Sequence, residues 1–338
     1  LIILGRVIAR LTRFSYHRMQ RYVPNRVAFI VGPVILAVVL TNVMNGVVIQ
    51  GILDAVDSSY AALDDLIEED VPPPELDVQS GSPDSLVDWH AMGRRGREFA
   101  ATGPDKSDIT AFTGRPAKQP IRIYVGLNSA ESIQDRAALA LAELKRVRAF
   151  ERKLLVVVTP TGTGWVDPMG QDPVEYLHDG DIATVAVQYS YLSSPISLMV
   201  EPEQSRESAQ AVFTLIYDHW RSLPADARPR LYLNGLRLGS HGSESSLRLY
   251  DLIGDPIQGA LWAGPPFPNQ IHASVTADRN PGTPQWLPEF RDGSMFRFTS
   301  QTIGGLLSVS PRRSYSIDVF LFLASVTFIW APASLYSY

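Results

Sequence analysis

The chain has 338 residues, a formal net charge of -5, and a composition of 45% hydrophobic and 19% charged residues. This length is enough for one large α/β domain together with a membrane element. The negative charge, with no basic stripe beside aromatic residues in the globular part, argues against a nucleic-acid-binding surface. Cysteine is absent, which excludes disulfides, cysteine nucleophiles and thiolate metal sites.

Charge is distributed unevenly over the first 77 residues. Residues 1–26 contain six arginines and no acid, residues 54–77 contain nine acids and no lysine or arginine, and residues 27–53 contain no charge at all. An uncharged run of this length can cross the hydrocarbon core of a bilayer, which needs about 20 helical residues. The sequence therefore predicts a basic N-terminal segment and a transmembrane helix within residues 1–53.

The arginine-rich flank is expected on the cytoplasmic side of the cell membrane. Everything after residue 53 is then expected on the extracytoplasmic side. Two alternatives to a membrane helix are a cleaved signal peptide and a buried helix of a soluble domain. The long basic region and the lack of a small-residue cleavage site speak against the signal peptide.

Residues 54–119 are predicted to connect the membrane segment to the globular core. Apolar residues near helical spacing among many acids predict an amphipathic helix over residues 54–71. Consecutive prolines end it, because proline removes a donor and forces extended geometry. We expect a linker at residues 72–86 and a mixed segment at residues 87–119 that wraps the edge of the domain.

Strand and helix patterns alternate through residues 120–301. We expect strands at 121–127, 154–158, 184–188, 231–234, 260–263 and 295–298, and helices at 135–150, 203–222 and 244–253. This alternation predicts an α/β fold with a doubly wound, mostly parallel sheet and helices on both faces. Residues 264–292, rich in proline and glycine, are expected to form a long loop that either caps a site or runs over the surface.

The atypical tail, residues 302–338, contains an uncharged hydrophobic run at residues 319–335. Seventeen residues are marginal for a membrane span. The alternative is a peripheral hydrophobic helix or strand, and the sequence does not decide between the two.

The stretch of residues 230–244 predicts a buried strand, a tight glycine turn and a helix. That is the layout of the G-x-S-x-G nucleophile elbow, with Gly235 and Gly239 at its glycine positions. Arg237 stands where the serine is required. A guanidinium stays protonated and has no usable lone pair, so it cannot attack an acyl carbon. At the exposed tip of the turn Arg237 would bind an anion, reach into solvent or pair with an acid such as Glu244.

Ser240 is the possible substitute nucleophile, three residues after Arg237. A strained elbow projects one side chain from the edge of the sheet, and Ser240 is expected to point elsewhere. Its structural alternative is to cap the N-terminus of the following helix.

The loop after the strand at residues 154–158 contains Gly162, Thr163 and Gly164. A loop in that place supplies one backbone N–H of an oxyanion pocket, and Leu238, directly after the nucleophile position, supplies the other. A plain glycine-rich turn is the alternative.

No cofactor or metal is predicted. Asp167, Asp172 and the stretch from His178 to Asp181 lack the spacing of a known metal site, so we expect turn and capping residues there.

With these features in place, the chain resembles the actinobacterial (mycobacterial-type) membrane-bound α/β-hydrolases, which carry an N-terminal transmembrane domain ahead of an α/β-hydrolase domain. The resemblance covers roughly residues 21–301. It rests on residues 22–26, 81–89, 123–130, 159–168, 188–191, 235–239 and 261–267.

The resemblance implies an α/β-hydrolase-like domain over residues 120–301 and serine-hydrolase chemistry on an acyl or ester substrate at a membrane. It places the nucleophile where this chain has Arg237, with the acid and the histidine further downstream. Residues 302–338 contain Asp318 but no histidine.

Three hypotheses follow. The first is a membrane-anchored hydrolase-family protein that is inactive or impaired, because a catalytic triad acts as a unit. The second is a non-catalytic protein that uses the same pocket to bind an anionic lipid, with membrane lipids as partners. The third is an active esterase with a relocated nucleophile.

Overall fold

A computed structural model of the chain describes residue 64, residues 71–192, residue 197, residues 202–247 and 254–299, and the backbone of residues 326–330. All of these belong to one compact unit that runs from Ala61 to Tyr338. The predicted membrane helix, and nearly all of the predicted amphipathic helix, lie outside the described residues. Within the described part, no helix is both long enough and apolar enough to cross a bilayer.

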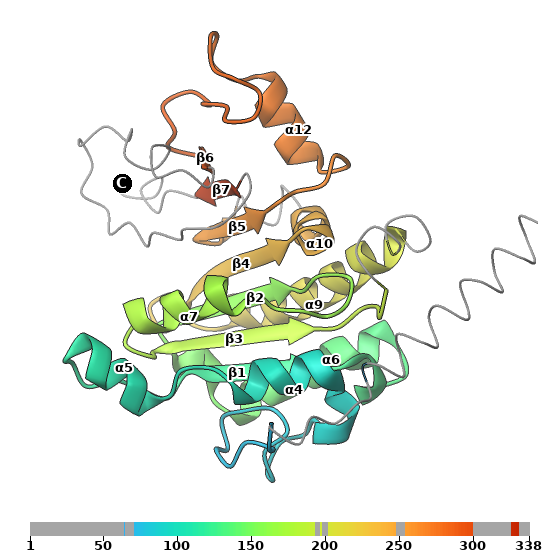
Figure 1. Ribbon diagram of the computed structural model, residues 1–338, viewed down its shortest axis with the longest axis vertical. Coiled ribbons are helices and arrows are strands. Elements are labelled where there is room, and N and C mark those ends of the chain that lie inside the picture. The colour runs from blue at the N-terminus through green and yellow to red at the C-terminus, as the bar shows by residue number, and fades with distance from the viewer. Residues whose placement is uncertain are drawn as a thin grey trace, which may run out of the picture. The chain divides into compact units, whose positions relative to one another are not determined.

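A seven-stranded sheet in the order β1-β3-β2-β4-β5-β7-β6 forms the centre of the described part of the chain (Figure 1). β1, β3, β2, β4 and β5 are parallel, and β7 is antiparallel to both β5 and β6. The strands are β1 (Ile121–Val125), β2 (Leu154–Thr159), β3 (Ile182–Val187), β4 (Arg230–Leu236), β5 (Gly259–Ala263), β6 (Phe296–Thr299) and β7 (Val326–Trp330). The mostly parallel α/β fold is therefore confirmed.

The three strands β1, β2 and β3 are buried along their whole length. Their sequences are nearly continuous apolar runs because helices cover both faces of a parallel sheet. The described helices are η2 (Trp89–Met92), α4 (Gly93–Ala101), α5 (Lys106–Thr113), η3 (Leu127–Ser129), α6 (Ile133–Arg146), η4 (Ala149–Glu151), α7 (Pro168–Leu177), α9 (Pro202–Ser222), α10 (Leu238–Ser246) and α12 (Gln270–Ala277).

The strand order assigns the helices to two layers. The connections β1–α6–β2, β3–α9–β4 and β4–α10–β5 run across the sheet in one direction, whereas β2–α7–β3 runs back. Because crossovers between parallel strands are right-handed, α6, α9 and α10 lie on one face and α7 on the other. α4 lies on the face of α7, since Phe99 on α4 and Glu175 on α7 both contact the β1 side chain Arg122.

The helix after the elbow begins earlier than predicted. The sequence placed it at residues 244–253, but α10 starts at Leu238, directly after Arg237. Glycine and serine are weak helix formers, which hid the first turn from pattern reasoning. In the structure this first turn is fixed by packing, with Gly239 and Gly242 in close backbone contact with β2 and α9.

Two segments expected to be irregular are ordered by tertiary contacts. In the predicted linker 72–86, the Ser80 N–H donates to the Arg122 carbonyl oxygen at 3.1 Å, and the Ser80 hydroxyl accepts from the Tyr124 N–H at 3.0 Å. This part is therefore attached to β1 instead of being a free spacer. The predicted loop 264–292 contains α12.

The structure decides between the two alternatives for the hydrophobic tail at a few of its residues. Within the hydrophobic run 319–335, residues 326–330 form β7 and pair with β5 and β6. For this part the strand alternative is confirmed and the membrane segment is wrong.

Candidate functional site

Arg237 is the only residue between the end of β4 and the start of α10, so the chain turns there within one residue. Its backbone has φ 53 and ψ -120, a region that residues with a side chain rarely adopt. The Arg237 N–H donates to the Ala263 carbonyl oxygen at 2.8 Å, and the Arg237 carbonyl oxygen accepts from the Ser240 N–H at 2.9 Å. These bonds hold the sharp strand-to-helix bend that was predicted for the elbow.

Glycine is required on both sides of this bend. A Cβ at Gly235 would lie 2.6 Å from the Gly239 carbonyl oxygen, and a Cβ at Gly239 would lie 2.1 Å from the Thr159 carbonyl oxygen. Backbone atoms cannot move aside as a flexible side chain can, so each position excludes a larger residue. The two glycines of the G-x-S-x-G pattern therefore have the steric role that the elbow gives them.

The Arg237 side chain is exposed at the tip of the turn. Its Cγ lies 3.9 Å from where a Cβ on Gly264 would stand. The predicted ion pair with Glu244 does not form. The Glu244 carboxylate is buried and accepts from the Asn269 side chain at 2.9 Å and from the Ile271 N–H at 2.7 Å.

Ser240 cannot take over as an exposed nucleophile in this structure. Its side chain is 0% exposed, and its hydroxyl donates to the Arg237 carbonyl oxygen at 2.6 Å. The prediction that Ser240 caps α10 is also wrong, because Arg237 occupies the N-cap position and makes no side-chain capping bond. His241 follows on α10, and its Nδ1 has no hydrogen-bond partner among the described residues.

The predicted oxyanion loop lies beside the elbow. β2 and β4 are parallel neighbours with Thr159 opposite Gly235, so their carboxyl ends meet. Leu238 begins α10, where the first backbone N–H groups have no partner within the helix. The structure thus brings together the two segments from which an oxyanion pocket is built.

The loop itself is closed by internal hydrogen bonds. The Gly164 N–H donates to the Thr161 carbonyl oxygen at 2.9 Å, and the Thr161 N–H donates to the Trp165 carbonyl oxygen at 3.1 Å. The Gly164 carbonyl oxygen accepts from the Tyr124 hydroxyl at 2.7 Å. Because the Gly164 N–H is used inside the loop, it is not available as an oxyanion donor.

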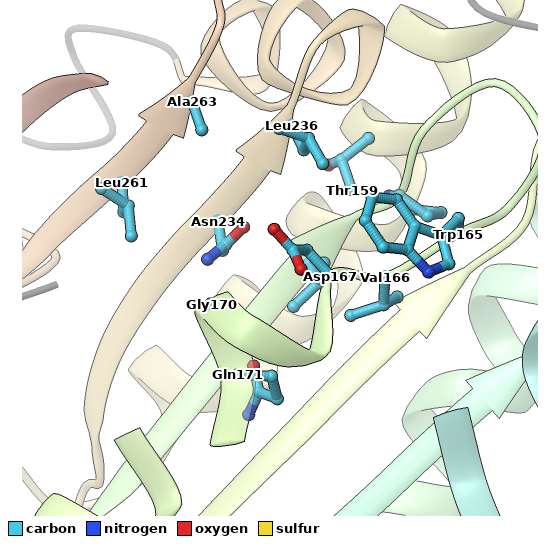
Figure 2. A pocket seen from close by; sticks show the side chains of 12 residues that line it. Thr159, Trp165, Val166, Asp167, Gly170, Gln171, Asn234, Leu236, Leu261 and Ala263 are labelled. Atoms are coloured by element: carbon cyan, nitrogen blue, oxygen red, sulfur yellow. The ribbon is translucent and has the colours of Figure 1, made fainter. Parts of the chain in front are cut away.

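A small pocket opens at the carboxyl ends of β2, β4 and β5, next to the elbow (Figure 2). Its volume of about 30 Å³ has room for roughly two water molecules. Trp165, Asp167, Gln171 and Asn234 contribute polar or aromatic groups to it. Thr159 and Gly170 also line it, and the apolar wall is formed by Val158, Pro160, Val166, Leu236, Leu261 and Ala263.

Asp167 is the N-cap residue of α7, which agrees with the capping role expected from the sequence. Its carboxylate accepts from the Met169 N–H at 3.1 Å. Burial raises the pKa of Asp167 above its ordinary value, and the nearby Asp172 carboxylate raises it further. Asn234 was missed as a pocket residue. The signal was a lone amide in an apolar strand, three residues before the elbow tip.

Two of the acids that lack the spacing of a metal site form ion pairs. Asp172 lies 2.5 Å from Arg122, and Asp181 lies 2.9 Å from Lys118. Among the residues that the structure describes, no group of three or more His, Cys, Asp or Glu side chains is placed to hold a metal ion.

The parallel sheet, the strained turn and the adjacent loop together define the scaffold of an α/β-hydrolase. A sequence model of the Alpha/beta-hydrolase family matches residues 121–318, and a model of the N-terminus of the same family matches residues 1–104. The chain belongs to this α/β-hydrolase family. No curated protein and no solved structure shows significant similarity to it.

Proposed function

We propose that this chain is a non-hydrolytic, membrane-anchored member of the family, and that its elbow binds an anionic group instead of attacking an ester. The observation that carries the proposal is the exposed arginine at the strained tip of the turn, where the reaction needs a hydroxyl. The scaffold is retained and the reacting atom is missing.

The absence of hydrolysis is inferred from the two candidate side chains. The Arg237 guanidinium has no lone pair to offer. The Ser240 hydroxyl is buried and donates its hydrogen to a carbonyl oxygen, so no base takes the proton that a nucleophile must lose.

Anion binding is inferred from the charges around the turn. A cationic side chain beside the positive end of a helix dipole is unfavourable by itself, and an anion between them removes the repulsion. The guanidinium offers a planar pair of donors that fits a carboxylate or phosphate, and the first N–H groups of α10 offer more. The ligand we propose is the carboxylate or phosphate of a lipid.

The membrane anchor is inferred from sequence. The uncharged run at residues 27–53 is long enough for a span, and its basic flank favours the cytoplasmic side. The domain is then placed on the extracytoplasmic face of the cell membrane. A reporter enzyme fused after residue 53 tests this placement, and activity characteristic of the cytoplasm would overturn it.

The experiment on the elbow titrates octanoate and octyl phosphate into the detergent-solubilised full chain. We expect Arg237→Gln to weaken binding at least about tenfold, because a charge-assisted bond is lost. Arg148→Gln is a matched control, since Arg148 is also an exposed arginine at positive φ but is the N-cap residue of η4. Equal affinity of the wild type and Arg237→Gln, with both folded, would refute anion binding at the elbow.

A further inference from the structure

The pocket beside the elbow contains one acid, Asp167, that has no part in the anion binding proposed at Arg237. We name it the Asp167 pocket, defined by Trp165, Asp167 and Asn234 within its apolar wall. It lies on the α7 face of the sheet, because α7 supplies Asp167 and Gln171. Its residues are distinct from Arg237 and Ser240.

Two polar groups of the Asp167 pocket face the opening together. Figure 2 shows the Asp167 carboxylate and the Asn234 amide pointing toward one another, with the Trp165 ring beside the carboxylate. One Asp167 oxygen caps α7 through the Met169 N–H. Within the described part of the chain, the other oxygen and the Asn234 amide have no hydrogen-bond partner.

The lining selects for a cation. Asp167 is the only ionisable side chain among the described residues that line the pocket. A carboxylate that loses solvent needs an opposite charge or donors to offset the lost hydration. The face of a tryptophan ring attracts cations as well, and the Asn234 carbonyl oxygen can accept another N–H.

Hydrogen bonding narrows the choice of cation. A primary ammonium brings three N–H donors, which a quaternary ammonium lacks. The pocket offers oxygen acceptors for them from Asp167 and Asn234.

We propose that the Asp167 pocket binds a primary ammonium group, held by the Asp167 carboxylate, the Asn234 amide oxygen and the Trp165 ring. The group comes either from a free amine or from an ethanolamine-type lipid headgroup. This site is independent of the anion site proposed at Arg237.

The neighbouring charges set the pH dependence. Burial raises the pKa of Asp167 most, and Asp172 on α7, which is itself paired with Arg122, raises it further. Arg237 stands at the adjacent elbow. Burial places the Asp167 pKa above its ordinary value, so protonation begins at a higher pH than for an exposed aspartate. Ammonium binding is therefore lost as the pH falls through that raised pKa.

The experiment titrates n-propylammonium into the detergent-solubilised full chain at neutral pH, with ligand NMR signals as the readout. We expect n-propanol and n-propyltrimethylammonium to bind at least about tenfold more weakly. Asp167→Asn should weaken n-propylammonium binding by a similar factor with the fold intact, because asparagine still caps α7. Asn234→Leu, which removes the second acceptor, should also weaken it.

Asp88→Asn is the matched control. Asp88 is also an N-cap aspartate, accepting from the His90 N–H at 2.8 Å, but it is exposed on η2. Equal binding of n-propanol and n-propylammonium, or unchanged affinity in Asp167→Asn, would overturn the proposal. Octyl phosphate titrated into the same Asp167→Asn sample reports on the elbow separately, so the two sites can fail independently.

A second pair of titrations separates the sources. Stronger binding of dihexanoyl phosphatidylethanolamine than of dihexanoyl phosphatidylcholine, lost in Asp167→Asn, assigns the ammonium to a headgroup. Equal binding of the two lipids, with n-propylammonium binding retained, assigns it to a free amine.

Discussion

Arg237 has the strained backbone of a nucleophile elbow, although the serine that such a turn normally projects is absent. The residue adopts φ 53 and ψ -120, and strain of this kind costs of order 1–3 kcal/mol. Backbone contacts leave no room for a side chain at either of the glycines Gly235 and Gly239. The turn is thus held by β2, β5 and α10, whatever side chain it carries.

Replacing the strained residue by glycine should stabilise the fold. We expect Arg237→Gly to raise the free energy of unfolding by about 1 kcal/mol, because relief of strain outweighs the added entropy of glycine in the unfolded chain. Urea unfolding measures the change. Arg237→Ala retains a Cβ and should give no such gain, and an equal gain in both variants would contradict the strain argument.

The sequence was informative about the residues of the elbow and less so about the surroundings. The spacing of Gly235, Arg237 and Gly239 predicted the turn, because those positions depend on local backbone geometry. Ser240 is turned away from the elbow tip, as expected. The ion pair between Arg237 and Glu244 and the capping role of Ser240 were predicted wrongly. Both depend on where α10 begins and on what packs against it, which local spacing does not encode.

At the scale of elements, α10 is connected to α12 by one buried carboxylate. Glu244 is 4% exposed, and its two oxygens accept from Asn269 and Ile271 at the start of α12. Asn269 caps α12 by position but makes no side-chain capping bond. The start of this short helix, at Asn269, therefore depends on a residue 25 positions earlier in the chain. This distant contact explains why residues 264–292 were predicted to form a loop.

Removing the Glu244 charge should loosen α12. In Glu244→Gln an amide N–H₂ replaces one acceptor and leaves a buried donor unsatisfied, which costs about 2 kcal/mol. Urea unfolding measures this loss, and amide hydrogen exchange should show it at residues 270–277. Glu203→Gln is the control, because the Glu203–Arg206 pair on α9 is exposed and should contribute little. Unchanged exchange in α12 would contradict the role of Glu244.

At the scale of the whole molecule, α6 binds the segment 77–86, which precedes the first strand of the sheet. Glu143 is buried and accepts from the Ser85 hydroxyl at 2.7 Å and from the Leu86 N–H at 3.1 Å. Arg146 pairs with Glu143 and also donates to the Asp77 carbonyl oxygen at 2.7 Å. A segment that is distant in sequence from α6 is therefore part of the same folded unit.

This attachment should be sensitive to acid. Burial raises the pKa of Glu143, but the bonds from Arg146, Ser85 and Leu86 outweigh it and leave the pKa below its ordinary value of 4.5. A depressed carboxyl pKa stabilises the fold above the unfolded value and stops doing so as the pH falls through the folded value.

We expect Glu143→Gln to lower the free energy of unfolding by about 2 kcal/mol at pH 7. The difference from the wild type should shrink below about pH 4.5. Chemical unfolding at several pH values measures it. A difference that stays constant down to pH 3 would contradict the assignment, and Glu151→Gln, in an exposed pair, is the control.

The layered core could be predicted from sequence and the edges could not. Continuous apolar runs such as 154–158 identify strands of a parallel sheet because burial on both faces dictates their composition. β7 lies within the uncharged run 319–335, whose composition suits a membrane segment as well as a strand. Its pairing with β5 and β6 decides between the two. The same holds for Ser80, whose order comes from β1.

The most direct test of the central claim treats the purified full chain with a fluorophosphonate probe, which labels activated serines. We predict no labelling of the wild type, because the elbow tip carries Arg237 and Ser240 is buried. Labelling of the wild type that disappears in Ser240→Ala would contradict the claim that this scaffold lacks a nucleophile.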